Sequence, residues 1–102
     1  MAMKKQFLKS RPVCKVTFAM PVQAAGDSQR AHLVGDFNEW QIGATPLKRR
    51  KDGTYAATVE LKTGREYQYR FVVDDGTWVN DPAADGYVPT PYGNDHNCVV
   101  SV

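Results

Sequence analysis

An antiparallel β-sandwich of immunoglobulin type, with about seven strands, is the all-β fold class that this sequence predicts. Apolar and polar residues alternate in several short segments, which is the period of strands with one buried side. Turn-forming Gly, Asp, Asn and Pro residues separate these segments. No window has the apolar period of an amphipathic helix longer than about one turn. Short strands at this spacing, within 102 residues, are typical of a single sandwich.

The expected strands follow in chain order from the alternation. They cover residues 13–20, 30–35, 54–61 and 66–73, a short strand through Trp78 and Val79, and residues 98–102. Turn residues separate them at 24–28, 52–53, 62–64 and 74–76, and Asp52-Gly53 is the strongest hairpin signal. Residues 80–97 are rich in Pro and Gly and predict a long ordered loop or a wandering edge.

Length and composition indicate one ordinary domain. The chain has 42% hydrophobic and 24% charged residues, and its net charge of +2 is too small to imply nucleic-acid binding. Residues 1–12 are basic but contain no apolar run long enough for a signal peptide or a membrane span. We therefore predict a cytoplasmic protein with a flexible basic lead-in over residues 1–12 and one β-sandwich domain over residues 13–102.

The two cysteines, Cys14 and Cys98, lie near opposite ends of the chain. A disulfide between the first and last strands is conceivable, but without an export signal we favour reduced thiols buried as small apolar residues. Paired CxxC spacing is absent, and the loop aspartates lack a recognised calcium-ligand spacing. The sequence therefore predicts no metal site and no cofactor.

Residues 33–40, Leu-Val-Gly-Asp-Phe-Asn-Glu-Trp, are the most informative stretch. They begin as a strand and then break into residue types that favour turns, because Gly and Asn tolerate positive φ and Asp bonds its own backbone. Trp40 follows just beyond the strand end. A large flat ring held on a rigid turn suits stacking on a ligand.

Five linked segments carry a family resemblance. They are Val34-Gly35-Asp36-Phe37-Asn38-Glu39-Trp40, Pro46-Leu47, Asp52-Gly53-Thr54-Tyr55, residues 67–82 and residues 97–102. From about Val13 to Val102 they resemble the family 48 carbohydrate-binding modules. This family includes the glycogen-binding domain of the AMP-activated protein kinase beta subunit and the early-set domains ahead of the catalytic barrel in branching and debranching enzymes. The resemblance implies an early-set sandwich that binds α-glucans such as glycogen, starch or maltooligosaccharides without catalysis.

The resemblance also implies site residues. Trp40 and Trp78 occupy the places of two stacking tryptophans, and Arg70 sits where the kinase subunit has a sugar-contacting lysine. Asn97 resembles an asparagine that hydrogen-bonds a glucose hydroxyl, and Tyr92 falls near an apolar residue that reaches into the bound glucan. Asn94 is a further candidate donor, in a segment one residue longer than in the kinase subunit.

The chemistry of these residues suits a glucan, because sugar rings offer apolar C–H faces for aromatic rings and hydroxyl rims for amide or cationic donors. Without the resemblance, other readings stay open. A tryptophan in a small β-sandwich is more often a core residue. Arg70 is equally consistent with a salt bridge to Glu60 or Glu66, and Asn97 with a turn into the last strand.

Catalysis and nucleic-acid binding are not predicted. Glycoside hydrolysis needs two carboxylates facing each other roughly 5–10 Å apart, whereas the aspartates lie beside Gly, Asn or Pro and look like turn residues. The run Lys48-Arg49-Arg50-Lys51 is the one feature favouring a phosphate or nucleic-acid partner. It is most simply a solvated hairpin arm that protects an edge strand. The alternative function is a protein-interaction or spacer domain associated with a glycan-metabolising enzyme.

Overall fold

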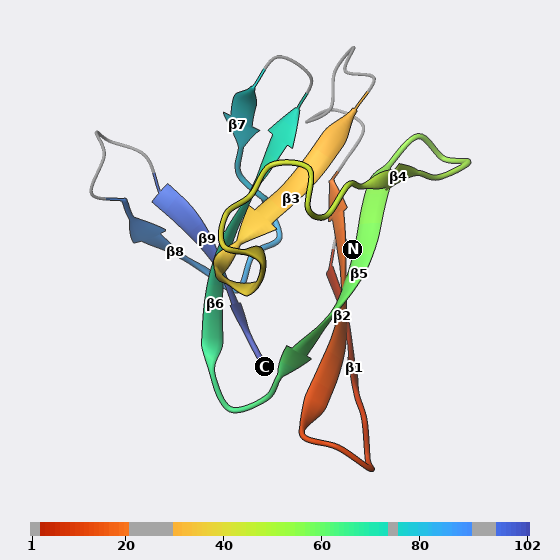
Figure 1. Cartoon of the computed structure of the whole chain (residues 1–102), viewed down its shortest axis with the longest axis vertical. Helices are drawn as coiled ribbons and strands as arrows, with labels where there is room; N and C mark the ends of the chain where they lie inside the picture. Colours follow the sequence, from red (N-terminus) through yellow and green to blue (C-terminus); the bar gives the residue numbers. More distant parts are fainter. Residues whose placement is uncertain (1–2, 21–29, 74–75, 91–95) are drawn as a thin grey trace.

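The structure is a computed structural model of the chain, and it describes residues 3–20, 30–73, 76–90 and 96–102 (Figure 1). Two antiparallel sheets form a sandwich, which confirms the predicted fold class. We call the four-stranded sheet, of order β1-β2-β5-β4, sheet A. The five-stranded sheet, of order β3-β6-β9-β8 with β7 also paired to β6, is sheet B. No helix in the described ranges could span a membrane.

The strands match most of the predicted segments. Their bounds are β1 Met3–Phe7, β2 Val13–Met20, β3 Ala31–Gly35, β4 Lys48–Arg49, β5 Tyr55–Lys62, β6 Glu66–Val73, β7 Thr77–Val79, β8 Gly86–Pro89 and β9 His96–Ser101. A short 3₁₀ turn, η1 (Asp36–Asn38), follows β3 directly. The predicted turn at 24–28 lies outside the described residues.

The core lies between the inward faces of the two sheets, as the alternation predicts. The side chain of Phe18 in β2 packs against Tyr69 in β6, with ring centroids 4.8 Å apart, and against Phe37, at 5.7 Å. Cys14 and Cys98 belong to opposite sheets, and both are buried and free, as expected. Burial raises the pKa of the Cys98 thiol to about 11, so this side chain behaves as a small apolar residue.

The predicted flexible lead-in over residues 1–12 is wrong for Met3–Phe7, which form β1 along the edge of β2. Lys4 to Phe7 are all exposed, so these four residues have no buried apolar face that alternation could reveal. Main-chain pairing to β2 and the ion pair of Lys5 with Asp85, at 2.7 Å, hold it. Lysines on such an outer strand discourage further pairing.

The segment 80–97 also contains more structure than predicted. β8 pairs with β9 as an edge strand, and β9 begins at His96 rather than Cys98. Asp81, predicted as a turn residue, is fully buried. Its carboxylate accepts hydrogen bonds from the Tyr69 hydroxyl and the Ala83 amide, and these bonds offset the cost of burying it. The segment that follows β7 is therefore held to the core through Asp81.

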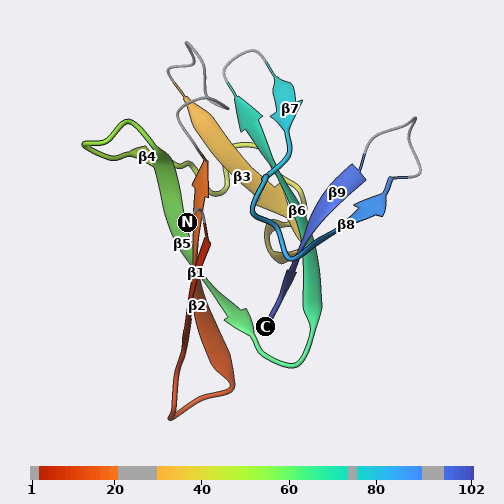
Figure 2. The same cartoon turned by 180° about the vertical axis from the view of Figure 1, so that it is seen from behind.

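The basic run over residues 48–51 is a hairpin arm, as predicted. β4 pairs with β5 at the edge of sheet A, and its side chains are exposed. Figure 2, the view from behind, shows this arm projecting beyond the body of the sandwich.

Candidate functional site

The outer face of sheet B gathers the predicted site residues that the structure describes. In β6, Tyr69 and Phe71 point into the core, so the alternate residues Gln68, Arg70 and Val72 point outward. The register sets Trp78 of β7 opposite Val72, on this outward row. From Gln68 to Val72 the row is about 13 Å long, at the usual rise of a strand.

Trp40 and Trp78 lie side by side on this face. Their ring centroids are 6.4 Å apart and their planes are inclined by 31°. Trp78 is 40% exposed, and Trp40 is partly exposed. Beside them Val34 and Val72 are buried although they belong to the outer face, so larger side chains form the surface there. The interior location that a sandwich tryptophan usually has does not apply to Trp78.

Arg70 is fixed against this aromatic pair. Its guanidinium carbon lies 5.6 Å from the ring centroid of Trp78, a cation–π contact. Its Nε donates to Oδ1 of Asn80 at 2.7 Å, and the residue is only 9% exposed. The carboxylates considered as alternative partners are engaged elsewhere.

Those carboxylates belong to Glu60 and Glu66. Glu60 pairs with Arg11 at 3.5 Å, and Glu66 accepts from the Ser101 hydroxyl. Arg70 contacts Trp78 and Asn80 on the outer face of sheet B.

The turn that carries Trp40 is held by the side chain of Asn38. Its Oδ1 accepts from the Gly35 amide, and its Nδ2 donates to the Leu33 carbonyl at 2.9 Å and to the Thr45 hydroxyl at 3.0 Å. The predicted turn is present as η1, although Gly35 itself is fully extended and does not supply the positive φ. Glu39 and Trp40 adopt it instead, both at φ 58°. A bulky residue in this region is uncommon and often marks a functional site.

Asp36 ties the Trp40 ring to the neighbouring strand. Its Oδ1 accepts from the indole Nε1–H at 3.0 Å, and its Oδ2 accepts from the backbone amide of Gln68 at 2.8 Å. Sequence reasoning treated Asp36 as a turn residue and missed this role. The one signal in the sequence is a carboxylate four residues before an indole, which does not by itself distinguish a tether from a turn.

The Asp36→Ala variant is expected to loosen the Trp40 ring while the sandwich stays folded. Each lost hydrogen bond contributes about 0.5–1.5 kcal/mol, and the position is exposed, so the cost to stability is small. NMR of the indole Nε1–H proton should show faster solvent exchange for Trp40 and little change for Trp78. Equal exchange for Trp40 in the variant and the unmodified protein would contradict the tether.

The predicted C-terminal site residues are only partly placed. Tyr92 and Asn94 lie outside the described residues. Asn97 is partly buried in β9, and its Nδ2 donates to Oε1 of Gln68 at 3.0 Å. Asn97 therefore belongs with Gln68 on the outer face of sheet B and forms an amide rim beside Arg70, which a turn role alone does not require.

Within the described residues, no group of three or more His, Cys, Asp or Glu side chains is placed to hold a metal ion. The outer face of sheet B instead offers indole rings, one guanidinium and an amide pair. Such a surface stacks on flat apolar groups and hydrogen-bonds hydroxyls or carbonyls at their edges.

A small β-sandwich with aromatic rings and amides on one sheet face is typical of binding modules built on immunoglobulin-like folds. The chain belongs to the family described as carbohydrate-binding module 48 (isoamylase N-terminal domain), which it matches over residues 24–88. The resemblance predicted from the sequence is confirmed.

Curated relatives include the 1,4-alpha-glucan branching enzyme GlgB of Aquifex aeolicus (strain VF5), which is 48% identical over 40 residues. This match covers 36% of the chain and 6% of the enzyme. The 1,4-alpha-glucan branching enzyme GlgB 2 of Xanthomonas campestris pv. campestris (strain 8004) is 34% identical over 53 residues, covering 51% of the chain and 7% of the enzyme. The matched region is thus a small part of each relative.

Proposed function

We propose that this protein binds α-glucans without catalysis through the outer face of sheet B, with Trp40 and Trp78 as the stacking surface. The observation that carries the proposal is the adjacency of the two indole rings, 6.4 Å apart with Trp78 well exposed. Membership of a carbohydrate-binding family and similarity to α-glucan branching enzymes support it.

The side chains around the rings have matching chemistry. Arg70 and the amide pair of Gln68 and Asn97 lie on the same face and supply donors and acceptors for sugar hydroxyls. Each aromatic contact contributes about 1 kcal/mol beyond burial, and water-mediated hydrogen bonds add little net energy. The expected dissociation constant is therefore roughly micromolar to millimolar.

The test is migration in a gel containing amylopectin. The unmodified protein should be retarded, and Trp40→Ala and Trp78→Ala should each lose retardation, with affinity for maltoheptaose reduced about tenfold or more. Phe7→Ala is the matched control, because Phe7 is an exposed aromatic residue, 56% accessible, on sheet A. Its retardation should equal that of the unmodified protein.

The alternative function, a protein-interaction or spacer domain, predicts a different pattern. Maltooligosaccharides would leave tryptophan fluorescence unchanged, and sedimentation would show association with another protein or a second copy. Retardation of both tryptophan variants to the same extent as the unmodified protein would rule out the stacking surface.

A further inference from the structure

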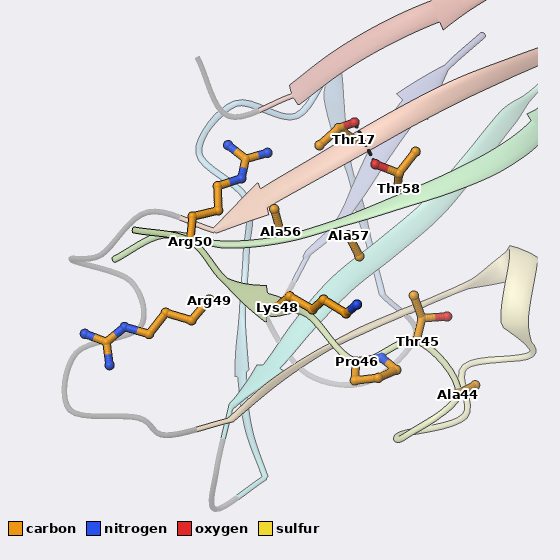
Figure 3. Close-up of a pocket in the computed structure, with 10 residues that line it drawn as sticks. All are labelled: Thr17, Ala44, Thr45, Pro46, Lys48, Arg49, Arg50, Ala56, Ala57 and Thr58. Carbon is orange, nitrogen blue, oxygen red and sulfur yellow. Dashed lines mark hydrogen bonds between the residues drawn. The ribbon is translucent and has the colours of Figure 1, made fainter. Parts of the chain in front are cut away.

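The outer face of sheet A, on the other side of the sandwich from the tryptophans, has small side chains at its centre. Residues of β2 and β5 that point away from the core include Thr17, Thr58 and Ala56, and Thr17 is paired with Thr58 in the register. Their hydroxyl oxygens are 2.9 Å apart, as the dashed line in Figure 3 shows. The central strands therefore form a low, hydroxyl-bearing floor.

Two hollows lie on this floor. One, of about 530 Å³, extends toward β4 and the preceding loop (Figure 3), and the other, of about 400 Å³, extends toward β1. Both are lined by Thr17 and Thr58. The two hollows therefore adjoin at this threonine pair, and we call them together the trough.

Both ends of the trough are cationic. Lys4 and Lys15 line the half toward β1, and Lys48 and Arg50 line the half toward β4. All four side chains are exposed. The carboxylate of Glu60, which shares this face, pairs with Arg11. Because the whole chain carries a net charge of only +2, this face holds a local excess of positive charge that attracts anions.

The geometry of the trough selects an extended anion over a compact one. Strands β1 and β4 are separated by β2 and β5, so the two cationic ends lie about 14 Å apart at the usual strand spacing. One phosphate group cannot reach both ends, whereas about four residues of extended peptide can. Among the described residues that line either hollow none is aromatic, so these residues offer no ring to stack on a nucleotide base or a sugar ring.

We propose that the trough on sheet A is a second binding surface, which takes an extended acidic segment of a protein. Glutamate and aspartate side chains of that segment pair with Lys4 and Lys15 at one end and with Lys48 and Arg50 at the other. The threonine hydroxyls hydrogen-bond its main chain between them. This surface is separate from the outer face of sheet B, which carries the tryptophans, and the proposal does not depend on the proposed glucan function.

The experiment measures binding of fluorescently labelled hexaglutamate by anisotropy at about 0.15 M salt, where diffuse attraction beyond roughly 8 Å is screened. Two variants each remove one end of the trough: Lys4→Gln with Lys15→Gln, and Lys48→Gln with Arg50→Gln. The matched control, Lys9→Gln with Lys62→Gln, removes the same charge from exposed positions that line neither hollow. Circular dichroism verifies that each variant is folded.

Each trough variant is expected to weaken hexaglutamate binding about tenfold, and the control less than about twofold. Equal loss in the control would overturn the proposal, because binding would then reflect net charge alone. Loss in only one trough variant would overturn the spanning geometry. Absence of hexaglutamate binding, or tighter binding of a thymidine hexanucleotide, would overturn the assignment of an acidic peptide. Retardation by amylopectin should be unaffected in all these variants.

Discussion

The Asp81→Ala variant is expected to lose about 3–5 kcal/mol of unfolding free energy, the largest effect we predict. Asp81 has no exposed surface, and its carboxylate accepts from the Tyr69 hydroxyl at 2.7 Å and from the Ala83 amide at 2.9 Å. Burial raises the pKa of the Tyr69 phenol far above its usual range, so this hydroxyl stays a neutral donor. Removing the carboxylate leaves the Tyr69 hydroxyl unpaired in the interior, releases the Ala83 amide of the adjoining turn and leaves a cavity, which together cost about 3–5 kcal/mol.

Urea unfolding of a double-mutant cycle measures this interaction. Tyr69→Phe removes the hydroxyl donor, so Asp81→Ala should cost less in that background than in the unmodified protein, by about 1–3 kcal/mol. Asp52→Ala is the matched control, because Asp52 is an exposed turn residue whose carboxylate accepts hydrogen bonds from Thr54. If Asp81→Ala were no more destabilising than Asp52→Ala, the anchoring role would be disproved.

The segment that contains Asp81 also contacts the outer face of sheet B, which carries Trp40 and Trp78. The residue before it, Asn80, accepts from Arg70 Nε, and the Asp81 backbone is held by Cys98 Sγ and by the Tyr87 hydroxyl. Neighbouring side chains thus point to opposite sides of sheet B, one into the core and one to the surface. Loss of Asp81 should therefore weaken the proposed glucan retention as well as stability.

Most strands of this fold could be predicted from the sequence because their burial alternates. Cys14 to Met20 and Tyr67 to Val73 each place apolar residues on one face, and that period identifies both the strand and its inward side. β1 could not be found this way, because its contacts to β2 are made by the main chain, which carries no side-chain pattern.

The candidate site was predictable only in part, and for a related reason. Trp40, Trp78 and Arg70 are residue types whose side chains by themselves indicate aromatic stacking and cationic hydrogen bonding. The structure brings these three side chains together. Asp36 and Asp81 have Gly, Asn or Pro neighbours, as does Asp52, whose role is confined to its own turn. Only the three-dimensional partners, Gln68 and the Trp40 indole for one and Tyr69 for the other, separate their roles.

Gly35→Ala is expected to reduce both stability and the proposed glucan binding, because this glycine connects the buried strand β3 to the turn that carries Trp40. Its backbone is extended, so any residue could adopt its dihedral angles. The constraint is space: an added Cβ would lie 2.6 Å from the Gln68 carbonyl oxygen and 2.8 Å from the Phe37 ring. The carbonyl belongs to the central strand of sheet B and cannot move without parting β3 from β6.

We therefore expect Gly35→Ala to lower the unfolding free energy by about 2–3 kcal/mol, the usual cost of overpacking a dense interior. The displaced η1 turn would carry Asp36 away from the Gln68 amide, which it now binds at 2.8 Å, and so misplace the Trp40 ring. Thermal unfolding and amylopectin retardation report the two effects. Gly86→Ala is the matched control, since a Cβ there meets nothing within 4 Å. If the Gly35→Ala protein were as stable as the Gly86→Ala protein, the predicted clash of the added Cβ with the Gln68 carbonyl would be disproved.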